Sequence, residues 1–163
     1  LIAPWMQDTL GIASGLNLLN ASILLGFLII PVVASLSDEA LAAVPLELRD
    51  ASYALGATRM ETIQKVVFPS ALPGIIASVL LGVMRALGET MVVLMAAGGA
   101  AIIPTLFTEP VRPLTSTIAA EMGETPVGSV HYYALFFAGL ILLVMTLMIN
   151  LASLYIEKRG TKR

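Results

Sequence analysis

Long apolar stretches separated by polar segments dominate this 163-residue chain. The apolar stretches lie at about Leu18–Leu36, Leu72–Ala97 and Tyr132–Ile156. A hydrocarbon core of about 30 Å requires about 20 residues of helix, so each stretch predicts one membrane span. Pro31 lies within the first stretch, where it should kink the helix or mark its exit. The pattern therefore predicts an all-α polytopic membrane protein with about three transmembrane helices.

The segment between the first two spans, about 37–69, predicts two short helices. Pro45 suits the first position of one helix, and Gly56 suits its end in a left-handed conformation. Thr58 and Glu61 have the spacing of a capping box that begins a second helix. Apolar residues recur here at helical spacing: Leu41, Val44, Leu48, Ala51, Leu55, Met60, Ile63 and Val67. These stripes pack either against the protein's own spans or against a partner, and periodicity does not distinguish the two.

The segment between the last two spans, about 98–131, is rich in glycine and proline and predicts mostly irregular structure. Residues 114–122 have the pattern of a short helix. Thr115, Ser116 and Thr117 at its start predict capping hydroxyls, and a helix N-terminus also suits an anion. We assign no role to the single histidine, His131.

Basic residues are distributed unevenly among the polar segments. Segment 37–69 contains Arg49, Arg59 and Lys65, and the end of the chain contains Lys158, Arg159, Lys162 and Arg163. Segment 98–131 contains Arg112 beside Glu109, Glu121 and Glu124. The positive-inside rule therefore places 37–69 and the C-terminus in the cytoplasm, and 98–131 on the periplasmic or extracellular side.

Composition argues against several classes of function. The chain is 58% hydrophobic and 12% charged, and it contains no cysteine, which excludes disulfides and thiolate metal sites. A net charge of −2 gives no basic face for nucleic acid, and a helix-turn-helix at 45–67 would lack a basic recognition helix. There is no glycine-rich phosphate loop ending in Gly-Lys-Ser/Thr and no His/Glu metal pattern. We therefore expect no catalytic residue, no metal and no cofactor on this chain.

Arg85 and Glu89 are charged residues inside the second predicted span. A charge at the centre of a membrane helix costs about 2.5–3.5 kcal/mol on insertion scales, so it usually has a partner or a function. Their four-residue spacing predicts that both lie on one helix face. They form either a structural ion pair whose charges neutralise each other or a polar binding site on the path of a charged solute, and we favour the second.

One motif in segment 37–69 resembles that of a known family. Asp50-Ala51-Ser52, then Gly56 after three residues and Val66-Val67-Phe68-Pro69 after nine more, resembles the cytoplasmic EAA loop of ABC importer permeases. The family form is Glu-Ala-Ala, three residues, Gly, nine residues, Ile, any residue, Leu and Pro. Gly56 and Pro69 match this form, and the residues that differ from it are conservative replacements. The resemblance implies coupling helices that dock on an ATPase subunit, with coupling residues Asp50, Ala51, Ser52, Gly56 and Pro69.

The second predicted span narrows the resemblance. Residues 85–89, Arg-Ala-Leu-Gly-Glu, are similar to the motif of permeases for tetrahedral oxyanions. Thr90-Met91 follow, as in the phosphate branch, whereas the sulfate and molybdate branches typically have Phe-Gly there. Residues 114–119 and the stretch from Ala138 also resemble the phosphate branch. The resemblance implies that the substrate path includes Arg85, Glu89 and Thr90.

The resemblance implies part of a type I ABC importer permease fold, with 1–163 as the C-terminal part of one permease domain of a longer protein. The implied function is ATP-driven import of inorganic phosphate, with sulfate, molybdate or phosphite as alternative substrates. A secondary transporter or channel is less favoured because neither needs a coupling loop. Expected partners are a second permease subunit, two ATP-binding subunits that hydrolyse ATP, an external phosphate-binding protein and membrane lipid. The expected location is the plasma (inner) membrane of a bacterium or archaeon.

Overall fold

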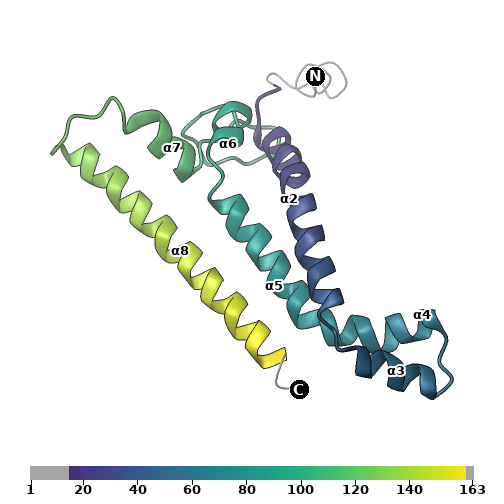
Figure 1. Ribbon diagram of the computed structural model, residues 1–163. Helices are drawn as coiled ribbons and strands as arrows, with labels where there is room; N and C mark the ends of the chain where they lie inside the picture. Colours follow the sequence, from purple (N-terminus) through teal and green to yellow (C-terminus); the bar gives the residue numbers. More distant parts are fainter. Residues whose placement is uncertain (1–14, 161–163) are drawn as a thin grey trace. The chain divides into compact units, whose positions relative to one another are not determined.

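The computed structural model describes residues 15–160 and the side chains of residues 15–158 (Figure 1). Helices dominate this part of the chain, and no strand occurs in it. Three helical stretches are long and apolar enough to cross a membrane: α2 (Leu18–Ala42), the continuous stretch Arg59–Leu87, and α8 (Val130–Gly160). The all-α class and the three candidate spans predicted from the sequence are therefore confirmed.

The first span is longer than the apolar pattern predicted. α2 continues to Ala42 rather than ending near Leu36, and Pro31 lies inside the helix. A proline removes one helical N–H, but membrane helices tolerate this loss when the surrounding residues continue the helix. At the other end, Asn17 Oδ1 accepts the backbone N–H of Asn20 over 2.8 Å, as an N-cap residue does.

The second span starts and ends earlier than predicted. Three helical elements run without interruption, namely α4 (Arg59–Thr62), the π-helical segment η1 (Ile63–Val67) and α5 (Phe68–Leu87). The chain then breaks at Gly88, and the short helix α6 (Met91–Ala96) follows Thr90. The prediction of one helix from Leu72 to Ala97 is therefore wrong in its last third. Glycine is a poor helix former, and polar residues in the next two positions favour a new helix start.

The last span and the helix before it agree with the sequence. α7 (Leu114–Glu121) has the predicted start and ends one residue early, and α8 contains the whole of the predicted span from Tyr132 to Ile156. The basic residues Lys162 and Arg163, which contribute to the predicted topology, lie outside the described residues.

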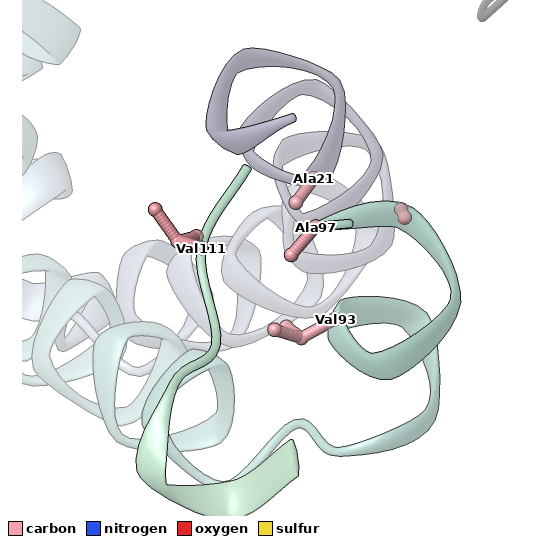
Figure 2. Close-up of a cluster of buried hydrophobic side chains, with 5 residues drawn as sticks. Ala21, Val93, Ala97 and Val111 are labelled. Atoms are coloured by element: carbon pink, nitrogen blue, oxygen red, sulfur yellow. The ribbon is translucent and has the colours of Figure 1, made fainter. Parts of the chain in front are cut away.

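The described chain forms two compact units, each with a small core. Unit 1 comprises 15–29 and 85–146, and unit 2 comprises 30–84 and 147–160. The core of unit 1 contains Ala21 of α2, residues of and next to α6, and Val111 (Figure 2). The core of unit 2 contains Val44, Val67 and Ala71. These small and β-branched side chains allow the backbones of neighbouring elements to approach closely.

In unit 2, α5 packs tightly against two other helices. A Cβ atom at Gly74 would lie 2.7 Å from the Cβ of Ala40, so this glycine permits the contact between α5 and α2. Ser153 Oγ of α8 donates to the backbone carbonyl of Ala77 over 3.4 Å. These contacts fix α5 beside the end of α2 that leads into the predicted coupling segment.

Candidate functional site

The predicted coupling segment forms two helices with a sharp turn between them (Figure 1). α3 (Leu46–Ala54) begins after Pro45, which lies just before the helix rather than at its first position. Gly56 has a φ of +82°, its N–H donates to Tyr53, and the N–H of Ala57 donates to Ser52. This pair of hydrogen bonds is a Schellman motif, which confirms the predicted role of Gly56.

The second helix of this pair begins with the predicted capping box. Thr58 Oγ1 accepts the backbone N–H of Glu61, and the Glu61 carboxylate accepts the backbone N–H of Thr58 over 3.0 Å. The motif satisfies two backbone donors that have no helical acceptor. The Schellman motif therefore fixes the end of α3 before the turn, and the capping box fixes the start of α4 after it.

A buried hydrogen bond connects the two helices. Ser52 Oγ of α3 and Thr62 Oγ1 of α4 lie 3.0 Å apart, and both side chains are buried. Ser52 replaces the second alanine of the family motif, and this difference is the sign in the sequence that a polar partner faces it. The partner itself, Thr62, was not predicted.

A second polar contact joins α3 to the first span. Arg49 Nη2 donates to the backbone carbonyl of Leu41 over 2.9 Å, near the C-terminal end of α2. The same carbonyl also accepts the backbone N–H of Val44 over 3.4 Å, and a cation near the C-terminal end of a helix is favoured by the helix dipole. The sequence indicated only that Arg49 contributes to the basic charge of segment 37–69, and it did not predict this contact.

The apolar stripes of the coupling segment divide between the protein and its surface. Val44 and Val67 are buried in the core of unit 2. Leu55 is 89% exposed and Met60 is 63% exposed, and the other large apolar residues exposed on these helices are Leu46, Leu48, Tyr53 and Ile63. Packing within the protein is therefore confirmed for part of the stripes. The turn between α3 and α4 presents an uncovered apolar surface, and docking of a partner there stays a prediction.

The remaining predicted coupling residues lie on the same unit. Asp50 and Ala51 are exposed on α3 beside the buried Ser52. Pro69 is exposed in the first turn of α5, directly after η1. Proline cannot donate a helical hydrogen bond, and Ser70 Oγ donates to the Val66 carbonyl over 2.6 Å in this region. The helical pattern therefore changes where coupling segment and span meet.

The predicted pair of charges in the second span does not form. Arg85 lies in the last turn of α5 with an exposed side chain, and Glu89 lies beyond the end of that helix. Glu89 Oε1 accepts the backbone N–H of Val92 over 3.3 Å, at the start of α6. The expectation of one shared helix face is therefore wrong, because the break at Gly88 changes the direction of Glu89.

The N–H donors of the Arg85 guanidinium are not used within the described part of the chain. No described residue forms an ion pair or a hydrogen bond with its side chain. A cation in the last turn of a helix is favoured by the helix dipole, so no carboxylate partner is required to hold it there. Thr90, the third predicted path residue, donates its hydroxyl to the Gly88 carbonyl over 3.3 Å and so stabilises the break.

The hydroxyls at the start of α7 do not cap that helix. Ser116 Oγ and Thr117 Oγ1 both donate to the Pro113 carbonyl, and the position before α7 has no side-chain cap. Thr115 Oγ1 instead donates to the Glu89 carbonyl over 3.0 Å. The capping prediction is therefore wrong, because these hydroxyls satisfy carbonyl acceptors, one of them in the break between α5 and α6.

Glu121 at the end of α7 joins two basic residues for which the sequence predicted no contact. Its carboxylate forms an ion pair with Arg112 and lies 2.9 Å from Nε2 of His131. Arg112 Nε also donates to the Gly99 carbonyl over 2.8 Å. These contacts connect the irregular segment, α7 and the start of α8 within unit 1.

Comparison with known proteins identifies the family. The sequence profile described as binding-protein-dependent transport system inner membrane component matches residues 2–162. The probable ABC transporter permease protein YqgH of Bacillus subtilis is 38% identical over 158 residues, which are 97% of this chain and 51% of that protein. No solved structure matches the chain.

Phosphate transport permeases are among the similar proteins. The phosphate transport system permease protein PstC of Haemophilus influenzae is 36% identical over 143 residues, 88% of this chain and 45% of that protein. The probable phosphate transport system permease protein PstC of Methanocaldococcus jannaschii is 36% identical over 146 residues, 90% of this chain and 46% of that protein. The chain thus spans about half the length of these relatives.

Proposed function

This chain belongs to the family of binding-protein-dependent transport system inner membrane components, and we propose that it is part of the permease of an ATP-driven importer for inorganic phosphate. The observation that carries this proposal is the similarity to PstC permeases of a bacterium and an archaeon over about nine tenths of the chain. The protein is a multi-pass membrane protein. Its proposed location is the plasma (inner) membrane, with the coupling segment and the C-terminus in the cytoplasm.

The proposed partner of the coupling segment is an ATP-binding subunit, which binds and hydrolyses ATP. Exposed apolar residues around the Gly56 turn supply the contact, with Asp50 and Ala51 on the exposed side of α3. The other predicted coupling residues determine the shape of the segment. Ser52 and Gly56 hold α3 and α4 in their arrangement, and Pro69 lies where the segment joins the span. A second permease subunit, a second ATP-binding subunit and an external phosphate-binding protein complete the proposed importer.

Closure of the ATP-binding subunits would move α3 and α4 together. The Ser52–Thr62 hydrogen bond and the capping box hold the pair in one arrangement. The Arg49 contact transmits movement to the end of α2, and the continuous helix from α4 through η1 transmits it to α5. Alternating access of the solute path then follows ATP binding and hydrolysis on the partner subunits.

Arg85 is the proposed anion-binding residue on the solute path. Its planar guanidinium has free donors and suits two oxygens of a tetrahedral oxyanion at once. Glu89 and Thr90 follow directly at the helix break. The negative charge of Glu89 weakens the attraction for an anion, which favours release, because a path site that binds too tightly does not conduct.

Transport by the complete importer tests this function. The full-length permease, its partner permease, the ATP-binding subunits and the binding protein are reconstituted in vesicles, and uptake of labelled phosphate is measured. We expect uptake that requires ATP and that excess sulfate or molybdate does not inhibit. Uptake without ATP would indicate a secondary transporter or channel, and stronger inhibition by sulfate, molybdate or phosphite than by unlabelled phosphate would indicate another oxyanion.

A further inference from the structure

The loop between α6 and α7 exposes an apolar tip in unit 1. Residues 100–108 carry no charge. Within them Ile103 is 92% exposed and Phe107 is 73% exposed, and Ile102 and Leu106 are also more than half exposed. Large exposed apolar patches mark surfaces that contact a membrane or another molecule.

The loop is connected directly to the start of a membrane span. The backbone N–H groups of Leu18 and Leu19, the first residues of α2, donate to the carbonyls of Glu109 and Phe107 over 3.1 and 2.8 Å. These donors have no acceptor within the helix, so the loop supplies it. Unit 1 also contains the end of α5 at Leu87 and the start of α8 at Val130. The apolar tip therefore lies where the spans end, at the level of a membrane surface.

Glu109 pairs several of the polar groups at the tip. The Glu109 carboxylate accepts the N–H and the hydroxyl of Thr105 over 2.6 and 3.0 Å, and the N–H of Leu106 over 3.4 Å. The N–H of Glu109 donates in turn to the Leu106 carbonyl. Each donor that is paired in this way costs less to remove from water than an unpaired donor would.

We propose that the tip formed by Ile102, Ile103, Leu106 and Phe107 inserts into the lipid interface of the membrane. The exposed apolar side chains are the inserted surface, Glu109 folds the loop that presents them, and the two hydrogen bonds to α2 set their depth. Insertion would hold the start of α2 at one level in the bilayer. This proposal depends on the membrane placement of the chain and not on which solute it transports.

Site-directed spin labelling of the assembled permease and ATP-binding subunits in lipid vesicles, without the binding protein, tests the proposal. Single cysteines are introduced as Ile103→Cys and Phe107→Cys, after replacement of any cysteine elsewhere in the full-length protein, and are labelled with a nitroxide. Glu124→Cys is the control, because Glu124 is exposed and polar in the same unit. Collision rates with oxygen, which partitions into lipid, and with a water-soluble nickel chelate are measured. We expect the oxygen-to-nickel ratio at both positions to be several-fold higher than at Glu124.

Other occupants of this surface give different results. A ratio equal to that of the Glu124 control would place the tip in water and overturn the proposal. Low collision rates with both reagents would mean that another part of the importer covers the tip, which also overturns it. Lipid contact that disappears when the phosphate-binding protein and ATP are added would assign the surface to the binding protein instead. Ile103 is the decisive position, because its side chain is almost fully exposed and its replacement removes little packing within the protein.

Discussion

Thr115 Oγ1 donates a hydrogen bond over 3.0 Å to the backbone carbonyl of Glu89. The contact joins the first turn of α7 to the residues between α5 and α6. Two of the proposed path residues, Glu89 and Thr90, are in this break. The position of the proposed path residues is therefore linked to α7, which the positive-inside rule predicts to lie on the opposite side of the membrane from the coupling segment.

The hydroxyl of Thr115 should be required to hold the break. Thr115→Val keeps the shape of the side chain but leaves the Glu89 carbonyl without this donor, which costs about 0.5–1.5 kcal/mol. We expect a lower thermal unfolding temperature of the purified importer and a changed KM for phosphate. Thr115→Ser, which keeps the hydroxyl, is the matched control and should behave like the unchanged protein. Equal KM values in all three proteins would argue against a link between α7 and the path.

The left-handed conformation of Gly56 should be required for coupling. With φ at +82°, a β-branched side chain strains the turn by about 1–2 kcal/mol, although no atom lies near enough to clash with a Cβ. We expect Gly56→Val to reduce co-purification of the ATP-binding subunit and ATP-dependent uptake, while the permease remains in the membrane. Gly56→Asn should be milder because asparagine tolerates this conformation.

Gly123→Val is the matched control for that substitution. Gly123 also has open space where a Cβ atom would lie, but it is not among the glycines with positive φ. Normal co-purification of the ATP-binding subunit with Gly56→Val, together with normal uptake, would show that the turn does not carry the docking surface.

Topology can be tested at two exposed polar residues. Gln64 lies in η1 and Glu124 lies in the loop after α7, and both side chains are exposed. In vesicles or cells, a membrane-impermeant thiol reagent should label Gln64→Cys and Glu124→Cys from opposite sides. The described part of the chain contains no cysteine of its own to interfere. Labelling of both from one side would contradict the orientation given by the positive-inside rule.

Acid should loosen the loop that Glu109 closes. Hydrogen bonds from the N–H and hydroxyl of Thr105 lower the pKa of Glu109 from its usual 4.5. A carboxyl whose pKa is lowered by folding contributes stability above its unfolded pKa and loses it as the pH falls through the folded value. Amide exchange at Thr105 and Leu106, corrected for the intrinsic effect of pH, should therefore stay constant at neutral pH and rise below 4.5.

Glu109→Gln is the control for this pH effect. Its amide keeps two acceptor lone pairs but no negative charge, so exchange at Thr105 should already be faster at neutral pH and should no longer depend on acid. An unchanged pH profile in this variant would mean that another group controls the loop.

Local signals in the sequence predicted much of the fold. Apolar length identified the three spans, and the Gly56 turn and the Thr58–Glu61 capping box formed as predicted, because each depends on neighbours within a few residues. The break at Gly88 was missed because the apolar length of the whole stretch was read as one helix, although Gly88 and the polar residues Glu89 and Thr90 interrupt it. The resulting error separated Arg85 from Glu89, which a continuous helix would have brought together.

Contacts between distant residues were not predicted. The bonds of Arg49 to Leu41 and of Thr115 to Glu89 join positions whose proximity depends on how the helices pack. The sequence showed that hydroxyl and basic residues were present, but periodicity does not give their partners. For the same reason the roles of Arg85, Glu89 and Thr90 in transport remain predictions.

The separation of Arg85 and Glu89 changes what a pair of substitutions should do. If the two side chains neutralised each other, Arg85→Gln and Glu89→Gln together would remove an ion pair and leave no unpaired charge. In the structure Glu89 instead accepts the Val92 N–H, and no described residue pairs with Arg85. The double variant should therefore not recover what Arg85→Gln loses.

Phosphate uptake in four proteins decides between these interpretations: the unchanged importer, Arg85→Gln, Glu89→Gln and the double variant. We expect uptake to be lost or strongly reduced in both proteins that carry Arg85→Gln, because glutamine keeps polarity without the charge that attracts an anion. Glu89→Gln should retain the bond to Val92, since an amide oxygen also accepts. Arg85→Lys should be impaired as well, because an ammonium lacks the planar fork that suits two oxygens. With membrane abundance and subunit assembly as controls, recovery of uptake in the double variant would show that the charges serve structure rather than transport.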